Sequence, residues 1–88
     1  MRIYYSTKFE REYRKLPLNI KKSAEKKEKI FRKNPFDPRL KTHKLKGTLK
    51  EFWAFSINYQ YRIIFEWIDT EEIWLHSVGK HSIYQLWD

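Results

Sequence analysis

Residues 43–81 read HKLKGTLKEFWAFSINYQYRIIFEWIDTEEIWLHSVGKH, and this stretch decides the fold. It contains two long runs of aromatic and β-branched residues, which favour neighbouring strands of a twisted sheet. Polar residues bracket these runs, with His43 in front, Arg62 at the start of the second run and His81 behind. We therefore expect these three side chains to meet at one side of the sheet.

The two apolar runs have the two-residue period of strands. Trp53, Phe55 and Ile57 alternate with smaller or more polar residues, so one face of this strand is predicted to lie in the core and the other to be more polar. The run 61–68 is apolar on both faces, which indicates a central strand.

The spacing of the last two strands places Arg62 near His81. If a hairpin pairs Ile68 with Ile73, the same register puts Arg62 opposite Gly79. His81 then lies within a few residues of Arg62, just beyond the end of its strand. This convergence is the main reason to treat the two residues together.

The first half of the chain is predicted to form a strand and two helices. Residues 2–5 have the composition of a short strand. Thr7 and Glu10 have the spacing of a capping box, so we expect a helix to begin at Thr7. Asn19 is the expected cap of a second helix, which runs to about Lys33 and carries a strongly basic outer face.

The remaining segment, residues 35–50, is expected to be a loop with a basic rim, because no periodicity is present in it. The predicted order is strand, helical hairpin and then antiparallel strands (β-α-α-β-β-β). This is an α+β fold with the helices on one face of the sheet. At this length we expect a single domain over residues 1–88.

Charge is distributed unevenly along the chain, whose formal net charge is +8. Residues 1–50 carry 17 Lys and Arg against 5 Asp and Glu, whereas residues 51–88 carry 2 against 6. A basic half of this size attracts polyanions, of which nucleic acid is the commonest in a cytoplasm. Two other interpretations remain open: a basic helix surface that only aids solubility, and a docking site for an acidic protein.

Cysteine is absent from the sequence, which excludes disulfides and thiolate metal sites and fits a reducing compartment. No apolar run approaches the roughly 20 residues that a membrane span needs. We expect a soluble, cytoplasmic protein.

Arg62, His81 and His43 are the candidates for chemistry. Arg62 lies in an otherwise apolar strand and needs an anionic partner or a polar rim, because an unpaired buried guanidinium is costly. Its partner is Glu66 on the same face of the strand, the C-terminal carboxylate, or a bound phosphate, which its planar fork suits. Histidine is a side chain suited to proton transfer near neutral pH, which makes His81 and His43 candidates, although a loop or strand-end histidine is also common as surface filling.

Four lysines and one tyrosine extend this candidate site. The basic loop carries the predicted substrate-binding residues Lys41, Lys44, Lys46 and Lys50. Tyr84 follows His81 by three residues and has three possible roles: stacking on a base, donating a proton or packing the tail. His76 alternates within a strand and is interpreted as structural. Three histidines without cysteine give only a weak metal signal, and we predict no metal and no cofactor.

Four segments together resemble the RelE/ParE superfamily of type II toxin–antitoxin toxins. They are LKTHKLKG (40–47), FWAFSI (52–57), YRIIF (61–65) and VGKHSIY (78–84), and they occur in the order and spacing of that family. The resemblance covers essentially the whole chain and is greatest to the histidine-bearing YafQ-like and YoeB-like ribonucleases.

The resemblance also assigns residues. His43 matches the histidine that precedes the Leu-x-Gly segment in YafQ-like toxins, His81 the catalytic histidine after the last strand, Arg62 the strand arginine and Tyr84 the C-terminal tyrosine. RelE itself has two lysines on the strand where this chain has Ala54 and Ser56, and an arginine in place of His81. The resemblance therefore implies a reaction driven by histidine rather than by lysine.

This family membership implies metal-independent cleavage of mRNA, usually on a translating ribosome, with the RNA 2′-OH as nucleophile. It also implies a cognate acidic antitoxin as partner. Two alternatives remain: a ParE-like inhibitor of DNA gyrase, and a non-catalytic member that binds only RNA or the antitoxin.

Overall fold

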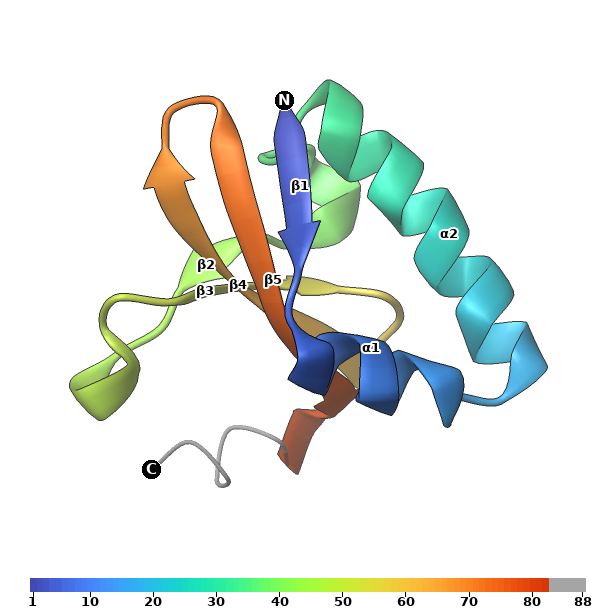
Figure 1. The fold of residues 1–88 in the computed structure, drawn as a ribbon. Coiled ribbons are helices and arrows are strands. Elements are labelled where there is room, and N and C mark those ends of the chain that lie inside the picture. Colours follow the sequence, from blue (N-terminus) through green and yellow to red (C-terminus); the bar gives the residue numbers. More distant parts are fainter. Residues whose placement is uncertain (83–88) are drawn as a thin grey trace.

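A computed structural model of the chain describes residues 1–82 and contains two helices and one five-stranded sheet (Figure 1). The elements in order are β1 (Arg2–Tyr5), α1 (Thr7–Arg14), α2 (Leu18–Lys33), η1 (Pro38–Leu40), β2 (His43–Lys44), η2 (Gly47–Leu49), β3 (Trp53–Ser56), β4 (Tyr61–Asp69) and β5 (Glu72–Lys80), where η marks a short 3₁₀ helix. The predicted α+β class is confirmed. The segment 35–50 is more ordered than expected, because it contributes β2 and both 3₁₀ helices.

The sheet has the strand order β1-β5-β4-β3-β2. Every neighbouring pair is antiparallel except β1 and β5, which run parallel. β4 lies between β3 and β5, which confirms the central position predicted from its two apolar faces. The sheet is strongly twisted, so that β3 crosses β5 at a large angle in Figure 1.

The first helix begins at Thr7 as predicted, but the caps expected for both helices are wrong by one or two residues. Ser6, not Thr7, caps α1, and its hydroxyl oxygen accepts from the backbone N–H of Phe9. Ser6 N–H also donates to the carbonyl of Leu75, so this residue ends β1 and begins α1 at once. Pro17, not Asn19, precedes α2, because proline suits a position where no backbone donor is needed.

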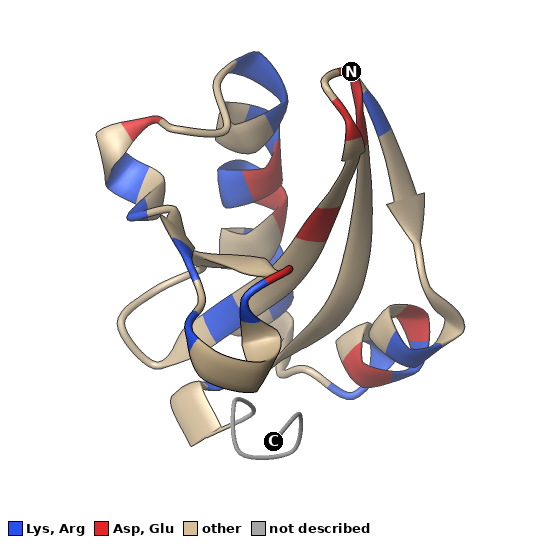
Figure 2. Cartoon of the chain, turned by 90° about the vertical axis from the view of Figure 1, so that its left-hand side faces the viewer, with Lys and Arg blue, Asp and Glu red and all other residues tan. Residues whose placement is uncertain are grey.

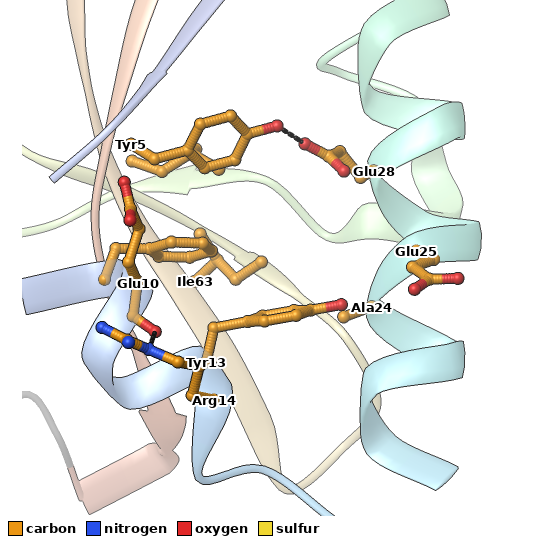
Figure 3. Close-up of a pocket in the computed structure, with 10 residues that line it drawn as sticks. Tyr5, Glu10, Tyr13, Arg14, Ala24, Glu25, Glu28 and Ile63 are labelled. Carbon is orange, nitrogen blue, oxygen red and sulfur yellow. Dashed lines mark hydrogen bonds between the residues drawn. The ribbon is translucent and has the colours of Figure 1, made fainter. Parts of the chain in front are cut away.

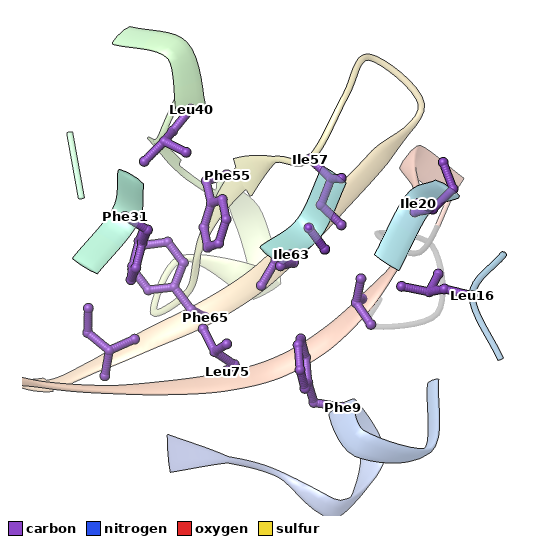
Figure 4. Close-up of a cluster of buried hydrophobic side chains, with 13 residues drawn as sticks. Phe9, Leu16, Ile20, Phe31, Leu40, Phe55, Ile57, Ile63, Phe65 and Leu75 are labelled. Carbon is purple, nitrogen blue, oxygen red and sulfur yellow. The ribbon is translucent and has the colours of Figure 1, made fainter. Parts of the chain in front are cut away.

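The main core lies between the helices and one face of the sheet, and aliphatic side chains surround a group of packed phenylalanine rings in it (Figure 4). Phe31 of α2 is fully buried, stacks on Phe55 with ring centroids 4.5 Å apart and meets Phe65 edge-on at 5.1 Å. Phe9 and Leu16 extend this core toward α1. The predicted position of both helices on one face of the sheet is thus confirmed.

A second, smaller cluster covers part of the opposite face of the sheet. Leu45 and Leu49, from the segment around η2, pack on Ala54 and Ile64, with Phe52 beside them. Ala54 is therefore fully buried, and Ser56 nearly so. The prediction that this face of β3 would be the more polar one is wrong at these positions, because the basic segment folds back over it.

The predicted register at Arg62 is confirmed, although the pairing from which it was deduced is wrong. Arg62 lies opposite Gly79, but Ile73 pairs with Trp67 and not with Ile68. Two irregularities, after Ile64 and after Trp67, shift the register and then restore it. None of the helices in residues 1–82 is long and apolar enough to cross a membrane.

Candidate active site

Arg62 is held in place by the turn that joins β3 to β4. Its Nη1 donates to the carbonyl oxygens of Asn58 at 2.5 Å and of Tyr61 at 3.1 Å. Arg62 and Ile64 are two residues apart on β4, so their side chains share the face of the sheet that points away from the helices. Ser56, Arg62 and Gly79 lie opposite one another on three neighbouring strands. The turn carbonyls therefore satisfy one end of the guanidinium and fix its orientation.

His81 continues the ladder beside Arg62. Its backbone N–H donates to the carbonyl oxygen of Gln60 at 2.9 Å, one step beyond the pair of Tyr61 and Lys80. Arg62 and His81 are thus diagonal neighbours on adjacent strands, with backbones about 7–8 Å apart. β5 ends at Lys80, and His81 begins a short 3₁₀ turn. His81 is exposed.

His43 lies on β2, opposite Ala54. Its Nδ1 lies 3.1 Å from the carbonyl oxygen of Lys41. A carbonyl can only accept, so Nδ1 carries the proton and Nε2 of the neutral ring keeps its lone pair. Lys41 adopts a left-handed backbone conformation with φ 52°, which is uncommon for a residue other than glycine and turns the chain into β2.

The strand order places the two histidines at different parts of the sheet. His43 is on β2 and His81 follows β5, so three strand spacings of about 4.8 Å each separate them across the sheet. They are also offset along the strands, because the register puts His43 in line with Ser77, four residues before His81. The backbones of Arg62 and His81 are therefore neighbours, whereas His43 lies two strands away from Arg62.

All four lysines predicted to bind substrate are exposed: Lys41, Lys44, Lys46 and Lys50. None of them forms an ion pair within residues 1–82. Figure 2 shows this side of the chain, with Lys and Arg around β2 and η2 and acidic residues at the β4–β5 turn. The positive charge of this segment is thus uncompensated and available to an anion.

Glu66 does not pair with Arg62, although it was one of the partners considered for that arginine; the C-terminal carboxylate, another of them, lies outside the described residues. Instead Oε1 of Glu66 lies 3.0 Å from Nε2 of His76. The His76 side chain is only 15% exposed and its ring contacts those of Trp74 and Phe52. This packing agrees with the structural interpretation of His76. Tyr84 lies outside the described residues.

Sequence reasoning missed Glu12 of α1. Its Oε1 accepts from Ser77 Oγ at 2.7 Å and from Val78 N–H at 3.1 Å, and its Oε2 accepts from Lys8 at 2.6 Å. Burial opposes its charge, but the hydrogen bonds from Lys8, Ser77 and Val78 outweigh burial and hold the pKa of Glu12 below its usual value. The only available signal was the four-residue spacing of Lys8 and Glu12, which resembles any surface ion pair.

A cavity of about 460 Å³ lies on the opposite side of the sheet, between α1 and α2 (Figure 3). Tyr5, Phe9 and Tyr13 line it, and the Tyr5 hydroxyl donates to Glu28 across its mouth. Burial and the neighbouring Glu28 raise the pKa of Tyr5. The cavity contains no histidine and does not include Arg62, so it is separate from the candidate active site.

No group of three or more histidine and carboxylate side chains is placed to hold a metal ion within residues 1–82. The candidate groups on the sheet are a fixed guanidinium with a histidine next to it along the backbone ladder, a second histidine on β2 and a lysine-rich rim. This set matches what is required to bind a phosphodiester and move protons around it.

Comparison with known proteins assigns the family. A family model described as RelE-like toxin of type II toxin–antitoxin system HigB matches residues 5–78. The chain belongs to this toxin family. The predicted superfamily is thereby confirmed, and the chain is a RelE-like toxin of a type II toxin–antitoxin system.

Solved structures show the same fold. The toxin is similar to a YoeB/ParE toxin from Agrobacterium tumefaciens, with TM-score 0.76 and 14% identity over 92% of this chain and 99% of that one. A copper-bound mutant toxin from Helicobacter pylori gives TM-score 0.75 and 26% identity over 94% and 97%. A YoeB–YefM complex from Staphylococcus aureus gives 0.73 and 21% over 92% and 97%. No curated protein matches the sequence.

Proposed function

We propose that this toxin is an mRNA endoribonuclease that acts on translating ribosomes. The observation that carries the proposal is the end of the β4–β5 ladder, where Arg62 lies opposite Gly79 and the backbone of His81 lies one diagonal step away. A guanidinium fixed beside a histidine provides both charge stabilisation and proton transfer at one phosphodiester.

In the proposed reaction the RNA 2′-OH attacks the adjacent phosphorus while a base removes its proton. The bond from phosphorus to the 5′ oxygen breaks, and an acid protonates that oxygen. The products are a 2′,3′-cyclic phosphate and a 5′-OH. The substrate supplies its own nucleophile, so the protein has to move two protons and stabilise the charge on the phosphoryl oxygens.

We assign His43 as the base and His81 as the acid. The bond from Nδ1 to the Lys41 carbonyl leaves Nε2 of His43 as an acceptor, which is the form that a base requires. Arg62 contributes the part of its guanidinium that the turn does not occupy to the phosphoryl oxygens, and Lys46 assists. Tyr84 belongs to the proposal through the family resemblance.

The lysine-rich rim and the basic face of α2 would hold RNA through its phosphates. Such contacts position a substrate without reading its sequence. The absence of an ion pair at Lys41, Lys44, Lys46 and Lys50 within residues 1–82 supports this role, because no internal carboxylate has to be displaced first.

We also propose that an acidic antitoxin neutralises the toxin in the cytoplasm. The YoeB toxin of Staphylococcus aureus has been solved in complex with YefM, and the present toxin shares its fold. A net charge of +8 would attract an acidic partner to the same basic surface that binds RNA.

The decisive experiment is to induce the toxin in a bacterial host beside Arg62→Ala and His81→Ala variants and to map new 5′ ends in cellular mRNA. We expect in-frame cleavage with the wild type and its loss in both variants. Tyr59→Ala, which changes an exposed side chain in the same turn, is the matched control and should cleave normally.

Growth arrest without new 5′ ends would contradict the proposal and point to inhibition of DNA gyrase, which a supercoiling assay with purified toxin would detect. Absence of arrest would leave a member that only binds RNA or antitoxin. Co-expression of an adjacent acidic reading frame should abolish the arrest.

A further inference from the structure

The outer edge of β5 is covered by a strand along only half of its length. β1 pairs with Glu72–Leu75 and ends at Tyr5. Within residues 1–82, the second half of β5, which leads to Gly79, therefore has no strand on its outer side and is held by a strand only through β4. An uncovered edge presents backbone groups without a strand partner.

Side chains of α1 take over where β1 stops. Ser6 N–H donates to the carbonyl of Leu75, and Ser6 Oγ donates to the carbonyl of His76. Glu12 then accepts from Ser77 Oγ and from the N–H of Val78. Two side chains thus replace the missing strand for three successive residues of β5.

We propose that Glu12 is a positioning residue for His81, an inference that rests on the proposed ribonuclease function. Its carboxylate fixes the backbone of β5 at Val78, one residue before Gly79 and three before His81. The place of His81 relative to Arg62 depends on this segment of strand, because Arg62 is held independently by the Asn58 and Tyr61 carbonyls.

The contacts of Glu12 are those of a clamp rather than of a surface carboxylate. Both oxygens are used, and Lys8 Nζ closes the network by donating to Glu12 at 2.6 Å and to Ser77 Oγ at 3.2 Å. Ser77 is fully buried, so its hydroxyl needs this partner. The network joins Glu12 to Ser77 and Val78, which lie 65 and 66 positions further along the sequence.

A positioning role and a purely structural role differ in the kinetics they predict. Loss of a structural contact lowers stability but leaves the folded molecules fully active. Loss of positioning lowers kcat in molecules that remain folded, because a displacement of about 1 Å can cost about 100-fold in rate. KM should change little, since the phosphate-binding lysines lie on the opposite edge of the sheet.

The test compares Glu12→Ala, Glu12→Gln and Glu10→Gln in an in vitro translation reaction in which the wild type cleaves the mRNA. We expect Glu12→Ala to lower kcat about tenfold to 100-fold with KM within about twofold of wild type. Glu12→Gln should rescue most of kcat, because its amide oxygen still accepts from Val78. Glu10 is exposed on the same helix and makes no hydrogen bond to β5 within residues 1–82, so Glu10→Gln should behave as wild type.

A second readout does not depend on activity. In folded Glu12→Ala, amide exchange at Val78 should accelerate and the ring signals of His81 should shift, while those of His43 stay in place. If the wild type does not cleave RNA, the proposed function fails, but these NMR changes still show whether Glu12 holds this part of β5 and His81 in place.

Wild-type kcat in folded Glu12→Ala would overturn the inference, as would unchanged His81 signals. If Glu12→Ala does not fold, Ser77→Ala takes its place: it removes one of the three donors to the carboxylate, and unchanged kcat and unchanged His81 signals in that variant would equally overturn it.

Discussion

The two faces of the sheet are built for different purposes. The face under the helices is sealed by stacked aromatic rings, with Phe31, Phe55 and Phe65 fully buried. The other face has only a small apolar cluster around Leu49 and otherwise presents Arg62 and the rows that lead to His43 and His81. Stability is thus concentrated on one face and the candidate chemistry on the other, which lets substitutions separate them.

The largest expected effect comes from breaking the sealed face. Phe31→Ala should lower the free energy of unfolding by about 3–5 kcal/mol, because the ring is fully buried between two others. A small domain has only about 5–15 kcal/mol in total, so much of this variant would be unfolded at 37 °C. Urea denaturation followed by circular dichroism measures the change.

Leu18→Ala is the matched control for that prediction. Leu18 is also a large apolar residue of α2, but it is 68% exposed. Its replacement should change the free energy of unfolding by no more than about 0.5 kcal/mol. Equal losses in the two variants would contradict the division of roles between the faces.

The next largest effect should appear on the helix-free face and only in activity. His81→Ala should lower cleavage by about 10²–10⁴-fold and leave the free energy of unfolding within about 0.5 kcal/mol of wild type. The pH dependence of kcat/KM sharpens this prediction. Wild type should give a bell-shaped profile, His43→Ala should lose the limb that rises with pH, and His81→Ala the limb that falls.

Loss of the opposite limb in each variant would reverse the assignment of base and acid. Profiles that keep both limbs would show that neither histidine transfers a proton.

Local patterns predicted the parts of the fold that depend on neighbours in sequence. The two apolar faces of β4 sufficed to place it at the centre, and the hairpin spacing placed Arg62 opposite Gly79. The resemblance in four segments identified the superfamily. Each of these inferences used residues that contact one another through short turns or a strict period.

The missed features depend on distant partners. β2 is two residues long and exists because His43 and Lys44 pair with β3. Ser6 and Thr7 are equally good caps by composition, and Ser6 is chosen because its backbone also ends the pairing of β1 with β5. Glu12 reads as a solvent-exposed helix residue, since its partners lie 65 and 66 positions away.

A moderate effect is expected from the rim of the helix-free face. Replacing Lys44 and Lys46 with glutamine should weaken RNA binding and reduce its dependence on salt. Each lost phosphate contact lowers the slope of log affinity against log salt by about 0.7 for a single strand. Lys15→Gln, which changes an exposed lysine at the end of α1, should leave the slope unchanged. Binding titrations at several salt concentrations measure these slopes, and equal slopes in all variants would show that the rim does not contact phosphates.

The smallest effect tests the clamp that joins α1 to the strand behind the candidate site. The pKa of Glu12 is held below its ordinary value of 4.5 in the folded toxin by the hydrogen bonds that outweigh burial. The folded state therefore binds fewer protons than the unfolded state, and the stability this contributes is present above about pH 4.5 and is lost as the pH falls through the lowered pKa.

Glu12→Gln has no such proton to bind, so its melting temperature should lie below that of wild type at pH 7 and approach it as the pH falls toward 3. Ser77→Ala removes one of the donors that lower this pKa, so its acid loss of stability should be complete at a higher pH than in wild type. A difference between wild type and Glu12→Gln that stays constant from pH 7 to pH 3 would mean that the carboxylate charge does not hold α1 to β5.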